Sequence, residues 1–329
     1  TPEDPGLIIY TSGTTGHPKG AVLTHRNLVC DAQNIIGIWE IVPSDVLCHG
    51  LPLFHVHGLC FALHTALLAG AGVVMLDSFN PETVAAVLAG KNRKKICSLF
   101  MAVPAMYAKL MDALVVKQLN FDHIRLWTSG SAPLPVQDFQ RITRLFGKQP
   151  VEREGMSETG MNFSNPLRGR RKPGSIGLPL PGVRARIVDP KSFTDVPRGQ
   201  VGEIWLKSAS ITPGYWRKPK ETSETFEQGW FRTGDLGRVD ADGYYYLTDR
   251  IKHIIITGGE NVSAKEVEHV INGAEGVAAQ ALQLSFLLGA GITVVSVAVA
   301  RPGVALFGTS ETVAELSVAY LIPMLVGFL

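Results

Sequence analysis

Short apolar runs alternate with helical patterns between residues 46 and 150, and this alternation constrains the fold more than any other feature. The strand-like runs ICSLFMAV (96–103) and IRLWTSG (124–130) are each followed by a pattern typical of a helix, PAMYAKLMDALV (104–115) and PVQDFQRITRLFG (135–147). Strands and helices that alternate in this way form βαβ units around a largely parallel sheet. The sequence therefore predicts an α/β domain for this part of the chain.

The sequence pattern changes after about residue 175. Strand-like runs separated by Gly, Pro and Asp turns follow, among them VRARIVDP (183–190) and GQVGEIWLKS (199–208). Asp242-Gly243 lies between two β-rich runs and indicates a hairpin. SAKEVEHVIN (263–272) opens with Ser and has Glu three residues later, a capping box that predicts an amphipathic helix. A small β-rich subdomain is expected here.

Composition excludes several function classes. The net charge of +2 gives no reason to expect nucleic acid as a partner. The four cysteines show no CxxC spacing, so thiols in a reducing compartment are expected rather than a metal site. Residues 46–76 carry no charge, but Pro52, several glycines and four histidines interrupt them, which favours a buried helix and strand over a membrane span.

The stretch IIYTSGTTGHPKGAVLTH (8–25) reads as a buried strand, a hydroxyl- and glycine-rich loop, a lysine and then a helix with Thr24 as its N-cap. Glycine lets the backbone approach an anion closely. Successive N–H groups and hydroxyls can donate to phosphate oxygens, and Lys19 supplies a positive charge. The Walker A loop is excluded because Lys19 is followed by Gly20. The stretch predicts a phosphate-binding site.

Several motifs in order resemble the acyl-adenylate-forming (AMP-binding) superfamily, which includes acyl-CoA synthetases, peptide-synthetase adenylation domains and firefly luciferase. They are YTSGTTGHPKG (10–20), EGMSETG (154–160), GYW (214–216), GWFRTGDLG (229–237) and DRIKHIIITGGENVSAKEVE (249–268). The resemblance implies an acid–CoA ligase. A carboxylate attacks the α-phosphate of ATP to give an acyl-adenylate and pyrophosphate, and coenzyme A then displaces AMP. Because anions meet in the first step, Mg²⁺ is expected at the phosphates.

The resemblance also implies a domain organisation. A large N-terminal α/β domain of βαβ units with a small β-rich subdomain is expected at 1–248, without the beginning of a usual member. The hinge and the start of a small α+β C-terminal domain are expected at 249–275, with Lys252 as the hinge residue. An apolar tail that does not match the family is expected at 276–329.

Site residues carry over from the matching motifs. The resemblance places catalysis at Thr11, Lys19, Ser157 and Glu158, with Ser157 at the α-phosphate and Glu158 holding Mg²⁺. The nucleotide-binding set is Ser12, Gly13, Thr14, Thr15, Gly16, Ser131, Ala132, Asp235 and Arg250. Asp235 and Arg250 match ribose contacts. One residue departs from the pattern: Glu154 replaces the aromatic that lies against adenine, so either adenine is held otherwise or ATP binds weakly.

The segments LPLFHVHGL (51–59), VPAMYAKL (103–110) and GMNFSNPLRGRRKPGSIGLPLPGV (160–183) look most like malonyl-CoA synthetases. Those enzymes pair a basic residue with the distal carboxylate, and Lys109 is the matching position. A lysine can balance the charge of the distal carboxylate, but unlike arginine it cannot form two parallel hydrogen bonds with it. The expected substrate residues are His55, Lys109, Ser129 and Gly130, with His57 as a further pocket candidate. A monocarboxylic fatty or aromatic acid is the alternative if Lys109 faces an apolar pocket mouth.

The end of the sequence opens a second interpretation. Residues 276–300 carry no charge, and no lysine follows Lys265 to serve as the family's C-terminal adenylation lysine. A fragment whose end arises from a frame error or read-through is one hypothesis, and a membrane segment at 279–300 is another. An active ligase and a nucleotide-binding remnant without turnover both stay open. The expected partners are a small carboxylic acid, ATP and coenzyme A, in the cytoplasm or, if a targeting segment was lost, in an organelle.

Overall fold

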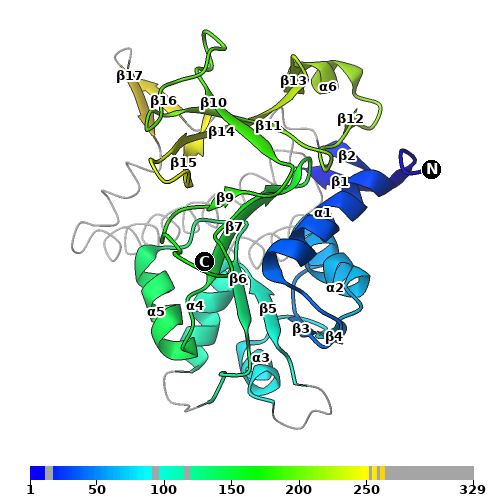
Figure 1. Cartoon of the computed structure of the whole chain (residues 1–329), viewed down its shortest axis with the longest axis vertical. Coiled ribbons are helices and arrows are strands. Elements are labelled where there is room, and N and C mark those ends of the chain that lie inside the picture. Colours follow the sequence, from blue (N-terminus) through cyan, green and yellow to red (C-terminus); the bar gives the residue numbers. More distant parts are fainter. Residues whose placement is uncertain (12–17, 91–95, 115–118, 252–253, 258–259, 264–329) are drawn as a thin grey trace, which may run out of the picture. The chain divides into compact units, whose positions relative to one another are not determined.

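The computed structural model describes residues 1–11, 18–90, 96–114, 119–251, 254–257 and 260–263 (Figure 1). The chain divides into two compact units, Thr1–His253 and Ile254–Leu329. The helix predicted at 264–272, the hinge residue Lys252 and the tail 276–329 lie outside the described residues. The division predicted at residues 248 and 275 stays a prediction.

Within the described residues, seven strands form the main sheet of the first unit, in the order β4-β3-β5-β6-β7-β8-β9. Neighbours from β4 to β7 are parallel, and β7, β8 and β9 pair antiparallel. The bounds are β3 Val46–His49, β4 Gly72–Met75, β5 Leu99–Ala102, β6 Leu126–Ser129, β7 Val151–Met156, β8 Gly160–Ser164 and β9 Leu178–Pro179. The predicted α/β fold with a largely parallel sheet is confirmed.

The two faces of the parallel strands differ. Phe100 and Trp127 lie opposite each other in β5 and β6, and Phe100 meets Tyr107 of α4 (Pro104–Ala113) edge-on at 5.8 Å. Trp127 stacks at 4.3 Å on Phe146 of α5 (Val136–Phe146). Alternate residues point to the other face, on the side of α1 (His25–Trp39) and α2 (Thr65–Leu68) (Figure 1). Helix α3 (Pro81–Leu88) is the crossover between β4 and β5.

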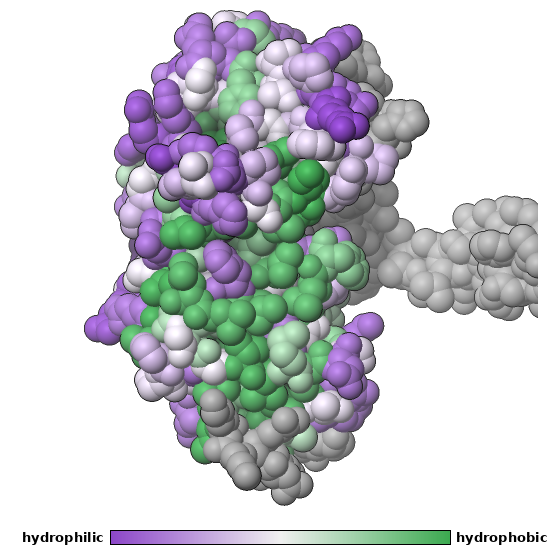
Figure 2. Space-filling view, turned by 90° about the vertical axis from the view of Figure 1, so that its right-hand side faces the viewer, coloured by the Kyte–Doolittle hydropathy of each residue, from purple (hydrophilic) through white to green (hydrophobic). Residues whose placement is uncertain are grey.

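The charge-free stretch forms the predicted buried helix and strand. Its helix η1 (His57–His64) has π-helical winding and continues into α2, and β4 follows. Short π-helical segments are rare and occur frequently at functional sites. Among the described residues, no helix has the length and apolar character needed to cross a membrane. Figure 2 shows the face of the molecule on this side, where apolar side chains gather in a band, and the exposed apolar residues of α2 and β4 are Leu67, Leu68 and Met75.

The stretch around Lys19 differs from the prediction. Lys19 begins a second strand, β2 (Lys19–Thr24), which pairs antiparallel with β1 (Pro5–Thr11), so the loop joins two strands instead of a strand and a helix. A capping box explains why the helix begins only after β2. The backbone N–H of Asn27 donates to Thr24 Oγ1 at 3.2 Å, and the backbone N–H of Thr24 donates to Asn27 Oδ1 at 2.9 Å. This cap fixes the start of α1 at His25, as predicted, and leaves the preceding residues free to pair. The predicted buried strand is wrong for β1, in which only Ile9 is buried and the other residues are half-buried or exposed.

The predicted β-rich part is confirmed. A five-stranded antiparallel sheet contains β10 (Arg184–Val188), β11 (Gly202–Lys207), β13 (Phe226–Glu227), β14 (Trp230–Val239) and β15 (Tyr245–Arg250). The hairpin predicted at Asp242-Gly243 joins β14 and β15, with Gly243 at φ 85°, which glycine adopts at little cost. Strand β12 (Gly214–Tyr215) pairs with β2 and precedes α6 (Pro219–Thr225). In the second unit, β16 (Ile254–Thr257) and β17 (Glu260–Ser263) pair antiparallel.

Candidate active site

The parallel strands end at one edge of the main sheet, where four predicted site residues lie at or just after the ends of β6 and β7: Ser129, Gly130, Ser157 and Glu158. Ligands of open α/β sheets bind outside the carboxyl ends of the strands. His49 ends β3, and Ser129 ends β6 and opens the loop that continues to Ala132. The turn of residues 157–159 follows β7. We therefore take this edge as the candidate active site.

Three motifs that lie far apart in the sequence meet at Glu158. The carboxylate Oε1 of this buried residue accepts hydrogen bonds from the hydroxyls of Thr11, at 3.3 Å, and Tyr215, at 3.0 Å. The ammonium group of Lys19 lies 5.2 Å from the centre of the Tyr215 ring. The carbonyl of Glu158 accepts from the Thr212 amide at 2.7 Å. This network fixes one carboxylate and one cation at the base of the β1–β2 loop.

The arrangement at Glu158 suits a divalent cation that is shared with phosphate. Oε1 is occupied by the two hydroxyls, and Oε2 accepts no hydrogen bond from the described residues. The described residues contain no cluster of three His, Cys, Asp or Glu that could hold a metal alone. Mg²⁺ is commonly bound by one or two carboxylates together with substrate phosphates and water. A single anchored carboxylate therefore fits the predicted Mg²⁺ role.

Among the residues predicted to bind phosphate, Ser157 is described by the structure, whereas those of the β1–β2 loop are not. Ser157 is half-buried in the β7–β8 turn, directly before Glu158. The loop residues Ser12, Gly13, Thr14, Thr15 and Gly16 lie outside the described residues, as does the hinge residue Lys252. Their predicted roles stay predictions.

The two predicted ribose contacts lie side by side. Asp235 in β14 is opposite Arg250 in β15, and Arg250 Nε donates to Asp235 Oδ1 at 2.8 Å. Asp235 is buried, whereas 56% of the Arg250 side chain is exposed. The pair thus presents a fixed carboxylate and an accessible guanidinium, a combination that can both accept from hydroxyls and donate to a ligand.

Glu154 belongs to this part of the site. Its Oε2 accepts from Asn162 Nδ2 at 3.1 Å. Burial, followed by the negative charge of Asp235, raises the pKa of Glu154 to about 8. At neutral pH the side chain is therefore mainly a neutral carboxyl group. The negative charge that Glu154 was expected to place beside adenine is therefore largely absent, because the surroundings favour the protonated form.

The loop after β6 contacts a different histidine from the one that sequence reasoning favoured. Ser129 and Gly130 are buried, and Ser131 and Ala132 are exposed. Ser131 has φ 68°, an uncommon conformation for a non-glycine residue, and such residues cluster at functional sites. Its hydroxyl lies 3.1 Å from Nδ1 of buried His57. His55 is exposed and lies against the Phe54 ring at 4.4 Å.

Lys109 is exposed on α4 and makes no hydrogen bond or ion pair within the described part of the chain. Helix α4 covers the Phe100 face of the sheet through Tyr107. The position therefore gives no support to the predicted pairing of Lys109 with a buried distal carboxylate, and that role stays a prediction.

Sequence reasoning missed Arg153. This residue in β7 is 3% exposed, and its guanidinium carbon lies 5.1 Å from the centre of the Phe61 ring of η1. A Cβ added at Gly130 would lie 2.6 Å from Arg153 Nε. The available signal was an arginine inside a strand, in VEREGM, where alternation places it on the opposite face from Glu152 and Glu154.

Comparisons with known proteins identify the family of the chain. The sequence pattern of the AMP-binding enzyme family matches residues 1–216. "Malonate--CoA ligase ACSF3, mitochondrial" of Mus musculus is 40% identical over 293 residues, which cover 80% of this chain and 50% of that protein. "Sulfoacetate--CoA ligase" of Cupriavidus necator is 39% identical over 285 residues, with 84% and 53% covered.

The solved structures give the same result. The crystal structure of ATP-bound MatB from Rhodopseudomonas palustris has a TM-score of 0.78 and 40% sequence identity, and the match covers 84% of this chain and 54% of that one. The chain thus spans about half the length of the relatives that it matches. By its sequence pattern, its relatives and its fold, the chain belongs to the AMP-binding enzyme family.

Proposed function

We propose that the chain carries the nucleotide- and acid-binding part of an ATP-dependent acid–CoA ligase, with malonate as the candidate acid. The observation that carries this proposal is the meeting of Thr11, Glu158 and Tyr215, because it joins three sequence-distant motifs around one carboxylate. Relatives named for malonate and sulfoacetate support a short acid with a second anionic group. Because the mouse relative is described as mitochondrial, an organelle is proposed beside the cytoplasm as the compartment.

The described residues suit the first half-reaction. Thr11 and Lys19 lie at the two ends of the β1–β2 loop, where they would hold the phosphates of ATP. Glu158 would hold Mg²⁺, which neutralises charge at the phosphates while the acid attacks. Ser157, in the same turn, would contact the α-phosphate. Asp235 and Arg250 would bind the ribose, and coenzyme A would then accept the acyl group.

Pyrophosphate exchange tests the proposal. Labelled pyrophosphate should enter ATP when malonate or sulfoacetate is present, and Glu158→Gln should slow this exchange by roughly 10²- to 10³-fold because it removes a charge that the transition state needs. Glu224→Gln, an exposed carboxylate on α6, is the matched control and should leave exchange unchanged. Absence of exchange with every acid, in a protein that binds ATP, would contradict the proposal.

Nucleotide binding without turnover is the second candidate function. The observation that favours it is Glu154, since a neutral carboxyl group cannot supply the stacking that an aromatic ring gives to a base. Equilibrium binding of ATP distinguishes the two candidates. A remnant binds ATP and shows no acid-dependent exchange, whereas a ligase shows both.

A further inference from the structure

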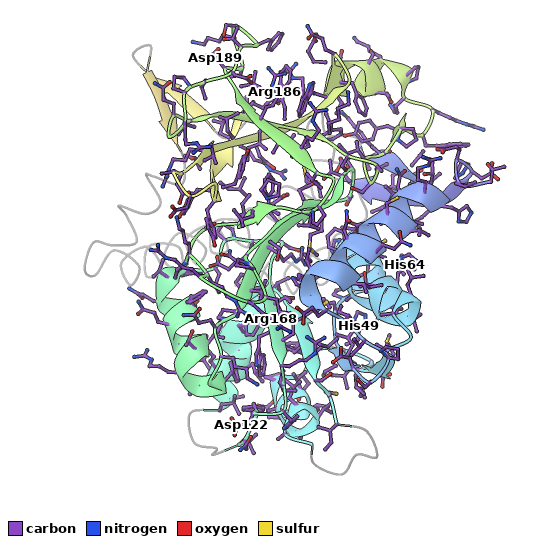
Figure 3. All side chains as sticks on the ribbon, viewed as in Figure 1. His49, His64, Asp122, Arg168, Arg186 and Asp189 are labelled. Carbon is purple, nitrogen blue, oxygen red and sulfur yellow. The ribbon has the colours of Figure 1, made fainter. Side chains whose placement is uncertain are left out.

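Helix α1 packs against β8, the strand that follows the turn of residues 157–159. Figure 3 shows this helix in the same part of the molecule as His49 and His64. Two polar residues of α1, Asn27 and Asp31, are four positions apart and therefore lie on one face of the helix. They are only 6% and 5% exposed. Because burial of a polar side chain costs free energy unless the side chain is hydrogen-bonded, the partners of these two residues show what the helix face does.

Asp31 holds the strand that leaves the turn. Its Oδ1 accepts a hydrogen bond from the backbone N–H of Met161 at 2.8 Å, and both residues are buried. The pairing of β7 with β8 is irregular at this place, with a register shift between Glu154 and Gly155. Irregularities of this kind bend a strand and are frequent next to active sites. A side chain of α1 thus fixes the backbone three residues after Glu158.

The contact between Asp31 and the start of β8 is close. Gly160 has φ 73°, and a Cβ added to it would lie 2.6 Å from Asp31 Oδ1 and 2.7 Å from Asp31 Cγ. Glycine adopts this left-handed conformation at little cost, and at this position only a hydrogen leaves room for the carboxyl group. The position of the Asp31 side chain and the position of the turn therefore depend on each other.

Asn27 holds the same turn by an indirect route. Its Nδ2 donates to two carbonyls of the segment 209–212, at 2.8 and 2.9 Å. Ser210 of this segment donates from Oγ to the carbonyl of Thr159 at 2.8 Å, and the last amide of the segment donates to the carbonyl of Glu158 at 2.7 Å. One face of α1 therefore holds the turn through two routes, directly at β8 and through the segment 209–212.

The direct contact needs an acceptor oxygen on Asp31 rather than its charge. Burial raises the pKa of Asp31 to about 7, against the opposing effects of the Met161 hydrogen bond and the positive charge of Arg153. Both protonation states are therefore populated near neutral pH. A carboxyl group and a carboxylate each keep an oxygen that accepts a hydrogen bond, and so does a primary amide. An asparagine at this position should then hold Met161 as the aspartate does.

These contacts reach the backbone of the turn and of β8, whereas the Glu158 carboxylate itself accepts from Thr11 and Tyr215. We propose that Asp31 is a positioning residue for Glu158: through Met161 and the turn, it keeps the carboxylate at the place where Mg²⁺ and phosphate would be held. This inference rests on the proposed function, which gives Glu158 its role. Asp31 touches neither the nucleotide nor the metal in this assignment, and it acts through the backbone alone.

Calorimetric titration of the full chain with ATP, once with Mg²⁺ and once with EDTA, tests the inference. Wild type should bind ATP more tightly with Mg²⁺. Asp31→Ala removes the acceptor and should weaken binding about tenfold with Mg²⁺, while binding in EDTA stays within about twofold, because only the placement of the carboxylate changes. Asp31→Asn keeps an acceptor oxygen and should bind within about threefold of wild type in both solutions. Gln33→Ala, at an exposed position on the same helix, is the matched control and should change neither affinity.

Two further measurements keep the test independent of a folding defect. Ser210→Ala leaves α1 intact and removes one anchor of the turn, so it should weaken ATP binding with Mg²⁺ by about threefold and leave binding in EDTA unchanged. Amide hydrogen exchange of the nucleotide-free protein follows the turn directly. The segment 157–163 should exchange faster in Asp31→Ala than in wild type, and at the wild-type rate in Asp31→Asn. A purely structural Asp31 would instead weaken ATP binding equally with and without Mg²⁺.

The outcomes separate this inference from the proposed function. A wild type that gains no ATP affinity from Mg²⁺ overturns the inference, and so does an Asp31→Ala variant that keeps the gain or loses affinity equally in both solutions. If Asp31→Ala loses only the gain from Mg²⁺ but no acid supports pyrophosphate exchange in wild type, the ligase proposal fails and the positioning role stands. If exchange occurs and Asp31→Ala keeps both its rate and its Mg²⁺ requirement, the ligase proposal stands and the positioning role fails.

Discussion

The two ends of the parallel strands carry different kinds of polar site. At the amino ends, Asp45 precedes β3, Ser98 precedes β5 and Arg125 precedes β6. At the carboxyl ends lie Arg153 of β7 and His57 of η1, whose Nδ1 lies 3.1 Å from the hydroxyl of Ser131. Both ends contain an arginine, yet Arg125 donates to several acceptors, whereas Arg153 donates to none of the described residues. The difference teaches that the polar groups of the amino end are paired within the protein, whereas the carboxyl end keeps buried donors without a partner among the described residues.

The amino-end network is saturated. Arg125 donates from Nε to Asp45 Oδ1 at 2.8 Å and to the carbonyls of Trp39 and Glu40 at 3.0 and 2.8 Å. Ser98 Oγ donates to Asp45 Oδ1 at 2.7 Å. Although burial acts to raise the pKa of Asp45, the hydrogen bonds from Arg125, the Val42 amide and Ser98 hold it below its ordinary value. Within the described part of this end, Arg125, Ser98 and the Val42 amide each donate to an acceptor of the protein itself.

Removal of the amino-end arginine should give the largest effect. Arg125→Met leaves the Asp45 carboxylate buried without its main partner and should lower the free energy of unfolding by about 3 to 5 kcal/mol. Urea unfolding followed by circular dichroism measures this change. Arg141→Met, whose partner Asp112 is 70% exposed, is the control and should cost about 1 kcal/mol or less. Equal losses in the two variants would remove the distinction between the ends.

The same substitution at the carboxyl end should act in the opposite direction. Arg153→Met removes a buried charge without a partner and should raise the free energy of unfolding, by about 1 kcal/mol or more. The measurement is the same urea titration, performed side by side with Arg125→Met. A loss of stability like that of Arg125→Met would show that Arg153 is part of the structural framework and would break the comparison.

The sequence correctly predicted the parallel sheet that forms both ends, and the roles that it assigned to site residues stay predictions. Alternating apolar runs and the Thr24 cap are local signals, and they indicated the parallel sheet and the start of α1 correctly. Ordered motifs indicated Glu158, Asp235 and Arg250, which the fold brings into two contacts. The pairing of Lys19 in β2 was missed because a short apolar run does not say whether it continues as strand or helix.

Arg153 was missed, and His55 was favoured over the second pocket candidate His57, for a different reason. The sequence shows an arginine in a strand, but whether a partner covers it depends on residues of η1, α1 and β6 that come from distant parts of the chain. The π-helical winding of η1 also gives no periodic signal, and it buries His57 while His55 stays exposed. Unsatisfied hydrogen bonds become visible only when all neighbours are in place.

Glu154 offers a third test, because it is an acid at the carboxyl end that Arg250 and Asp235 influence. Its folded pKa of about 8 lies above the ordinary value of 4.5. The folded state therefore holds a proton that the unfolded state has already released, and stability should fall as pH rises from about 5 to 8. Glu154→Gln cannot titrate and should show a flatter dependence. Because Glu154 is only half-buried, solvent screening should keep this change below that of Arg125→Met. Parallel slopes for the two proteins would contradict the assignment.

The smallest expected effect is a gain of nucleotide affinity at the same residue. Glu154→Tyr replaces a carboxyl group by a ring that can stack on a base, an interaction worth about 1 to 3 kcal/mol. Because the ring must fit beside Asn162 and Asp235, we expect the lower part of this range, about a fivefold to tenfold tighter binding of ATP. Glu154→Gln distinguishes stacking from charge as the cause of a gain. It removes the titrating carboxyl group without adding a ring, so it should leave ATP affinity near that of wild type below pH 8. Equal gains in both variants would mean that charge, and not stacking, limits ATP binding at this end of the sheet.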